Sequence, residues 1–115
     1  WSDAEDFVRG IWLMVNRAMP KDFVLASNDC HSIRDFVNLS FNTLGIEGEW
    51  TGSDLNEVLK DKDGRVLVEI SDKFFRPADI LMGDNKEALD DLGWEPETSF
   101  EDLVKKMTEY DYNQA

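Results

Sequence analysis

Apolar residues recur at helical spacing near the start of the chain and define one face of a helix. The pattern begins after Ser2 and stops at Pro20, so it predicts a helix over residues 2–19. Ser2 and Glu5 stand three residues apart, which is the spacing of a capping box at a helix N-terminus. The apolar face consists of Phe7, Val8, Ile11, Trp12, Val15 and Met19.

Similar patterns predict three further helices, over residues 33–44, 85–93 and 99–112. Ser32 stands immediately before the first of these and Ser99 is the first residue of the last, positions where a hydroxyl can cap free backbone N–H groups. Gly45 follows the first and is a natural helix stop. The apolar stripes are Ile33, Phe36, Val37, Phe41 and Leu44 in the first helix, and Phe100, Leu103, Val104, Met107 and Tyr110 in the last.

Short β-prone runs between the helices predict strands. The strongest signal is the Asp63-Gly64 turn within residues 56–70, which predicts a β-hairpin. Further strands are predicted over residues 22–27, 46–53 and 78–82. Helices and short strands are mixed without an internal repeat or a linker. We therefore expect one small α/β or α+β domain over residues 1–115.

The chain is strongly acidic, and this limits its partners. It carries 12 Lys and Arg residues against 25 Asp and Glu residues, a formal net charge of −13. Such a surface repels polyphosphates, so we expect neither nucleic acid nor an anionic membrane as a partner. No apolar run approaches the roughly 20 residues of a membrane span. The single cysteine, Cys30, cannot form an internal disulfide, which favours a cytoplasmic location.

Motifs for several kinds of catalysis are absent from the sequence. There is no Gly-x-Gly-x-x-Gly or Walker loop, and neither tyrosine is followed four residues later by a lysine. Cys30 and His31 are interpreted as loop residues before the Ser32 cap, since a nucleophile needs an oriented base and zinc needs about four ligands. The run from Asp61 to Gly64 is interpreted as a hairpin turn rather than a calcium loop. No metal site is expected.

Most other charged residues are interpreted as surface groups. Asp3, Glu5 and Asp6, like Asp90 and Asp91, favour helix starts or solvated faces, and Arg9 and Arg17 lie off the apolar stripe of their helix. Arg34 is different, because a cation in the first turn of a helix is unfavourable for the helix dipole. We therefore expect Arg34 to have another reason for its position.

Arg76 is the cation with the clearest signs of a binding role. It stands between Phe75 and Pro77, which limit its freedom, in a chain that is otherwise acidic. A guanidinium can donate two parallel hydrogen bonds to a phosphate or a carboxylate. From the residues alone, two interpretations stay equally open: an anion site, or a structural ion pair with a nearby acid such as Asp79 or Asp84.

Three stretches together resemble one family. Residues 73–107, KFFRPADILMGDNKEALDDLGWEPETSFEDLVKKM, are similar to the C-terminal part of extended short-chain dehydrogenases that act on nucleotide sugars. Residues 22–37, DFVLASNDCHSIRDFV, and 5–15, EDFVRGIWLMV, narrow the resemblance to the GDP-mannose 4,6-dehydratase family. Its typical patterns include DFVIATGxxHSVREF, YFRPxEV, LxGDxxKA and LGWxP. The similarity runs in order over essentially the whole chain.

The resemblance implies an architecture and two site residues. The chain would be the C-terminal substrate-binding part of such an enzyme, without the Rossmann domain and the catalytic Thr, Glu, Tyr and Lys, which come before the residue that Trp1 matches. Arg76 matches the arginine of the family's RPxE motif, which contacts the nucleotide, and Asp79 falls on its acid. The acid is Asp rather than the usual Glu, and the segment between it and Gly83 is shorter than in the family.

The implied function is GDP-sugar binding in an enzyme that converts GDP-mannose to GDP-4-keto-6-deoxymannose. In the family, bound NADP oxidises the sugar at C4, water is eliminated across C5–C6, and the hydride returns to C6. No residue of this chain is assigned to those steps, and no cofactor is expected in it. The implied partners are a GDP-sugar, a Rossmann domain in cis or in trans, and further copies of the chain. Two alternatives stay open: a non-catalytic acidic interaction module, and part of a related nucleotide-sugar epimerase or reductase.

Overall fold

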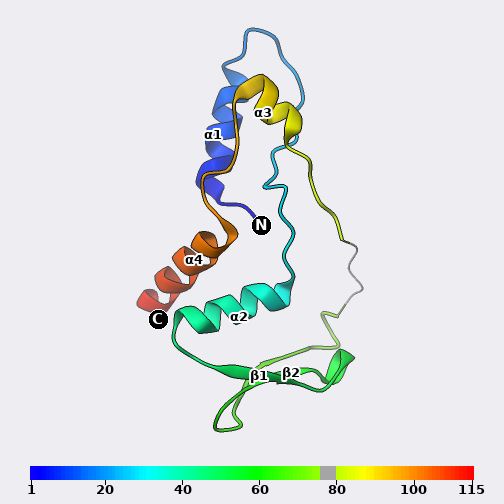
Figure 1. Ribbon diagram of the computed structural model, residues 1–115, viewed down its shortest axis with the longest axis vertical. Helices are drawn as coiled ribbons and strands as arrows, with labels where there is room; N and C mark the ends of the chain where they lie inside the picture. Colours follow the sequence, from blue (N-terminus) through cyan, green and yellow to red (C-terminus); the bar gives the residue numbers. More distant parts are fainter. Residues whose placement is uncertain (76–79) are drawn as a thin grey trace.

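The computed structural model describes residues 1–75 and 80–115, and these form a small mixed arrangement of helices and short strands, as the sequence predicts (Figure 1). In chain order the elements are α1 (Ala4–Val15), α2 (Ile33–Thr43), β1 (Gly48–Thr51), the 3₁₀ helix η1 (Asp54–Asn56), β2 (Val58–Asp61), β3 (Val66–Glu69), α3 (Lys86–Leu92) and α4 (Phe100–Gln114). No helix in this part of the chain is long and apolar enough to cross a membrane.

Serine caps define the starts of α2 and α4. The Ser32 hydroxyl accepts a hydrogen bond from the N–H of Asp35 (3.0 Å), and the Asp35 carboxylate accepts one from the N–H of Ser32 (2.8 Å). The Ser99 hydroxyl accepts a hydrogen bond from the N–H of Asp102 (3.1 Å) in the same way. These caps satisfy N–H groups that have no partner within the helix. Both predicted helix starts are therefore confirmed.

Helix α1 differs from its prediction in its bounds and in the face that it buries. Asp3, not Ser2, is the N-cap, and its carboxylate accepts a hydrogen bond from the N–H of Glu5 (2.9 Å). The helix buries Asp6 and Gly10, while most of its apolar stripe is exposed. The exposed members of the stripe are Val8, Ile11, Trp12 and Val15, followed by Met19 beyond the helix end. An apolar helix face normally packs against other protein.

Strands β1, β2 and β3 form one antiparallel sheet in that order. Trp50 pairs with Leu59, and Leu59 pairs with Val68, so these three residues align across the sheet. The turn between β2 and β3 contains Gly64 with a φ of 81°, a conformation that glycine adopts without a steric penalty. The hairpin that the Asp63-Gly64 pair predicts is thus confirmed.

Two of the predicted strands do not form in the described structure. Residues 22–27 run as an extended connection and pair with no strand, so this prediction was wrong (Figure 1). Residues 80–82 also form no strand, and the rest of the 78–82 prediction lies outside the described residues. β-prone residues make a ladder only where a second strand supplies backbone partners.

The chain is elongated rather than compact (Figure 1). Its radius of gyration is 18.0 Å and its extents are 59 × 32 × 21 Å, whereas a compact domain of this length has a radius of gyration of about 13 Å. The helices pack in pairs, α1 against α3 and α2 against α4. The buried apolar residues in the described part of the chain are few: Leu59, Ala88, Trp94, Phe100, Leu103 and Val104.

Candidate functional site

A mostly apolar cleft lies between α2 and the sheet, which Figure 1 shows near the same end of the molecule. Its volume is about 700 Å³. The apolar residues that line it are Ile33, Val37, Trp50, Val68, Ile70, Phe74 and Phe75. Apolar clefts of this size with a few polar groups are common sites of small-molecule binding.

Among the described residues that line this cleft, Arg34 is the cation, and its guanidinium is held by protein groups. It forms an ion pair with Glu57 and lies over the ring of Trp50, 5.0 Å from the ring centroid. The Trp50 Nε1 donates a hydrogen bond to Asn38 Oδ1 (2.7 Å), which fixes the ring. These contacts offset the unfavourable position of a cation at the start of α2. The contacts with Glu57 and Trp50 supply the reason that the sequence analysis expects for the position of Arg34.

Phe74 and Phe75 line the cleft at the end of the described segment before residue 76. Their N–H groups both donate to the carbonyl of Ser71, at 3.1 and 3.0 Å, and both rings are more than half exposed. Arg76 follows Phe75 directly in the sequence. The two predicted site residues, Arg76 and Asp79, lie outside the described residues, so their roles stay predictions.

The sole thiol and the sole imidazole belong to the loop before α2. The His31 ring stacks on Phe100, with 3.7 Å between centroids and 6° between planes, and its Nε2 lies 2.6 Å from Asp29 Oδ2. This hydrogen bond is the main reason why the pKa of Asp29 is lowered. Cys30 is exposed, and the described residues contain no group of three or more potential metal ligands. Because His31 stacks on Phe100, the first residue of α4, it holds the loop against that helix.

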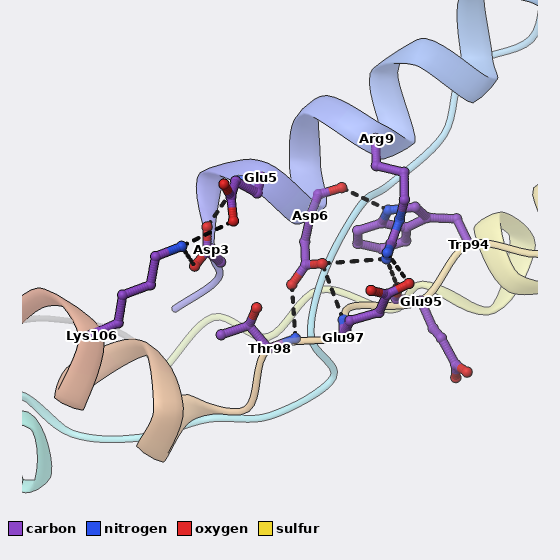
Figure 2. Close-up of polar contacts among 9 residues, drawn as sticks. All are labelled: Asp3, Glu5, Asp6, Arg9, Trp94, Glu95, Glu97, Thr98 and Lys106. Atoms are coloured by element: carbon purple, nitrogen blue, oxygen red, sulfur yellow. Dashed lines mark hydrogen bonds and ion pairs between the residues drawn. The ribbon is translucent and has the colours of Figure 1, made fainter.

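A buried carboxylate joins α1 to the segment between α3 and α4, and sequence analysis missed this contact (Figure 2). Asp6 is 4% exposed. Its side-chain oxygens accept hydrogen bonds from the N–H groups of Glu97 (3.1 Å) and Thr98 (3.0 Å). Its backbone carbonyl accepts a hydrogen bond from Trp94 Nε1 (2.8 Å). Asp6 lies in the first turn of α1, as one of its two interpretations predicts. The other interpretation, a solvated residue, was wrong, because the carboxylate is buried in a tertiary contact.

Arg9 completes this cluster, and its interpretation as a solvated residue was also wrong. The guanidinium forms ion pairs with Asp6 (3.3 Å) and Glu97, and donates a hydrogen bond to the carbonyl of Glu95 (2.6 Å) (Figure 2). Asp6 and Gly10 stand four residues apart on the side of α1 opposite its apolar stripe. Residues four apart lie on the same face of a helix, and a glycine lets another segment approach that face closely. The acid and the glycine together could therefore have indicated a contact face.

Asp3, which is 4% exposed like Asp6, forms a second link, to Lys106 of α4 at 2.9 Å (Figure 2). The hydrogen bond from Lys106 is the main cause that lowers the pKa of Asp3 below its ordinary 3.8, and the N–H of Glu5 contributes next. A lowered acid pKa stabilises the fold above pH 3.8, and this contribution is lost as the pH falls through the folded-state value.

We therefore expect Asp3→Asn to lower the urea midpoint at neutral pH. Asparagine retains the capping oxygen but removes the charge. The difference from the unchanged chain should disappear as the pH falls through the lowered folded-state pKa of Asp3, where the native carboxyl is also protonated. Denaturation curves recorded across this range test the expectation. An equal difference at neutral and acid pH would show that the charge of Asp3 is not the cause.

The described structure does not fit a nicotinamide dinucleotide. Such cofactors are held by a glycine-rich turn between a parallel strand and the N-terminus of a helix. Here the sheet is antiparallel, and Gly48 and Gly52 lie on β1 and in the turn before the short helix η1. No cofactor site is assigned to the described residues.

Comparison with known proteins decides the family. The family described as "GDP-mannose 4,6 dehydratase" matches residues 1–107. The chain belongs to the GDP-mannose 4,6-dehydratase family. The human and Dictyostelium discoideum proteins named GDP-mannose 4,6 dehydratase are each 40% identical to it over 114 residues, covering 96% of this chain and 31% and 32% of theirs. The Vibrio cholerae GDP-mannose 4,6-dehydratase is 35% identical over 128 aligned residues, covering all of this chain and 34% of its own.

The chain thus spans about a third of the length of the curated relatives it matches. The family match includes the three stretches on which the sequence resemblance rests, and it includes Arg76 and Asp79. The resemblance is confirmed at the level of the family. The described geometry contributes the α2–sheet cleft, whose described lining includes Phe75, one residue before Arg76 in the sequence.

Proposed function

We propose that residues 1–115 form the nucleotide-sugar-binding portion of a GDP-mannose 4,6-dehydratase-like protein, the part that follows the Rossmann domain. The observation that supports this most strongly is the family match over residues 1–107. The mostly apolar cleft beside α2 gives the chain a concave surface next in sequence to Arg76. The single cysteine adds a cytoplasmic location to the proposal.

In this proposal, Arg76 contacts the diphosphate or the ribose of a GDP-sugar, and Asp79 contributes an acid to the same site. A guanidinium suits oxygen-rich anions because its N–H groups form a planar fork. The structural alternative for Arg76 includes a pair with Asp84, whose Oδ1 accepts a hydrogen bond from the N–H of Lys86 at the start of α3 (2.9 Å). That contact gives Asp84 a role of its own at the start of α3.

The purified chain is expected to show no conversion of GDP-mannose and no stable NADP binding. The physical reason is that its sequence contains neither a glycine-rich dinucleotide loop nor a Tyr-x-x-x-Lys pair. Chromatographic separation of GDP-mannose from its product measures the conversion. Turnover by the chain alone would overturn this expectation.

A chimera provides the positive arm of the same experiment. In the chimera, this chain replaces the segment of the Vibrio cholerae relative that aligns with it. The alignment covers all of this chain. If the chain supplies the substrate-binding portion, the chimera should form GDP-4-keto-6-deoxymannose. A chimera that binds NADP and is folded, but leaves GDP-mannose unchanged, would count against the proposed function.

The exposed stripe of α1 favours a second candidate, a non-catalytic interaction module. Val8, Ile11, Trp12 and Val15 are each more than half exposed, and such patches tend to acquire partners. We expect the isolated chain to associate with itself at high salt, where the repulsion from its net charge of −13 is screened. Ile11→Glu should weaken this association, while Tyr112→Glu, at another exposed position, should not. Sedimentation velocity tests this, and a clean monomer at high salt would contradict it.

A further inference from the structure

Two extended segments approach each other near the start of α3 without pairing. The first, residues 22–28, connects α1 to α2, and the second, residues 80–85, leads into α3 (Figure 1). A Cβ atom added to Gly83 would lie 2.6 Å from Ala26 Cβ and 3.5 Å from Val24 Cγ1, so the two segments are in contact. The Asn28 side chain also accepts a hydrogen bond from the N–H of Asn85 (2.9 Å).

The 22–28 segment has the properties of a strand without a partner. Its side chains alternate over residues 22–25, where Phe23 and Leu25 are partly buried and Val24 between them is 56% exposed. Leu25 faces α1, because a Cβ added to Gly10 would lie 2.7 Å from Leu25 Cδ1. Within the described residues, no backbone N–H or C=O of residues 22–27 takes part in a backbone–backbone hydrogen bond. Such groups are available to pair with an added strand.

A groove with an apolar rim runs beside this segment. Its volume is about 420 Å³, and residues 24–29 line it together with Trp1, Phe7, Leu81 and Met82. Leu81 is 87% exposed, Met82 66% and Trp1 52%. The groove therefore combines unpaired backbone groups with exposed apolar side chains, the two features that an incoming β-strand satisfies.

We propose that this groove is the docking site for an extended segment from the part of a GDP-mannose 4,6-dehydratase that this chain does not span, either in the same polypeptide or in a separate one. The incoming segment pairs with the backbone of residues 23–26 and covers Val24, Leu81 and Met82. The relatives supply the occupant, because about two thirds of their length lies outside the match. The elongated shape of this chain supports the same conclusion. Its radius of gyration is 18.0 Å, larger than the roughly 13 Å of a compact domain of this length, so more of its surface is open to contact with further protein.

Hydrogen exchange of the backbone amides tests the proposal. In the isolated chain at low concentration, the amides of residues 23–26 should exchange almost as fast as in an unstructured peptide. In the chimera, pairing should slow them about 100-fold. The amides of β2 provide the internal reference, because its pairing with β1 and β3 is present in both proteins. If the chimera does not fold, this chain is mixed with the separately expressed remainder of the relative. The proposal is overturned if the amides of residues 23–26 are not protected in the chimera or in this mixture.

Two substitutions separate docking from general destabilisation. Val24→Asp should speed the exchange of amides 23–26 in the chimera about tenfold or more. Val66→Asp, at an exposed valine of similar accessibility on β3, should leave them unchanged. Equal effects of the two variants would overturn the proposal. Protection that rises with the concentration of the isolated chain would also overturn it, because the occupant would then be a second copy.

The inference rests on the proposed function only in taking its occupant from the same family, and the two can fail separately. A chimera that protects residues 23–26 but does not bind GDP would contradict the proposed function alone. A chimera that binds GDP with these amides still unprotected would contradict the docking site alone.

Discussion

Replacing Asp6 by asparagine is expected to lower the free energy of unfolding by about 3 kcal/mol. The carboxylate is buried, and its two oxygens accept hydrogen bonds from the N–H groups of Glu97 and Thr98. An amide presents only one acceptor, so one N–H group faces an NH₂ group, and Arg9 loses a charged partner. Urea denaturation followed by the fluorescence of the tryptophans measures the change.

Asp90→Asn is the matched control for this prediction. Asp90 pairs with Lys86 on the surface of α3, and its side chain is 53% exposed. Exposed ion pairs contribute little to stability, so this variant should unfold like the unchanged chain. If Asp6→Asn were as stable as Asp90→Asn, the cluster in Figure 2 would not be what joins α1 to the segment before α4.

Replacing Arg76 by alanine is expected to weaken GDP binding to the chimera about 10- to 150-fold, the equivalent of one charge-assisted interaction of about 1.5–3 kcal/mol. Arg76→Lys should recover only part of the affinity, because one ammonium cannot reproduce a two-pronged donor. The measurement is isothermal titration of GDP into each variant.

Arg65→Ala provides the control for Arg76, since Arg65 pairs with Asp61 in the hairpin turn and its side chain is 74% exposed. Its affinity for GDP should not change. Equal affinities of the unchanged chimera and Arg76→Ala, with the fold intact, would favour the structural ion pair instead. A loss of affinity in Asp79→Ala would show that the shortened segment still supplies an acid to the site.

The sequence predicted those parts of the fold that depend on neighbours in the chain. Ser32 and Ser99 bind N–H groups three residues away, and Gly64 supplies the positive φ of its turn, so helix starts and hairpin follow from local chemistry. The predicted strand over residues 22–27 does not form, because a strand depends on a partner that is distant in the sequence. The β-prone side chains of these residues are present, but a strand needs backbone hydrogen bonds to a second strand. Residues 80–85 contact this segment without forming such bonds.

Asp6 and Arg9 show a similar limit in the site analysis. Both looked like surface charges, because their partners lie far along the sequence, at residues 94–98. Only packing α1 against the segment after α3 shows that the acid is buried. The stripe from Val8 to Val15 was recognised as apolar, but its exposure could not be predicted, because periodicity identifies a face and not what covers it. For Arg76 and Asp79, which lie outside the described residues, the family pattern remains the basis of the prediction.

The most direct test of the central claim is a titration of GDP into the unchanged chimera. If this chain is a nucleotide-sugar-binding portion, the chimera should bind GDP with an affinity within about tenfold of that of the Vibrio cholerae relative, a difference of at most about 1.4 kcal/mol. NADP binding, measured on the same preparation, shows that the remainder of the chimera is folded. A chimera that binds NADP like the relative but gives no heat with GDP would contradict the claim.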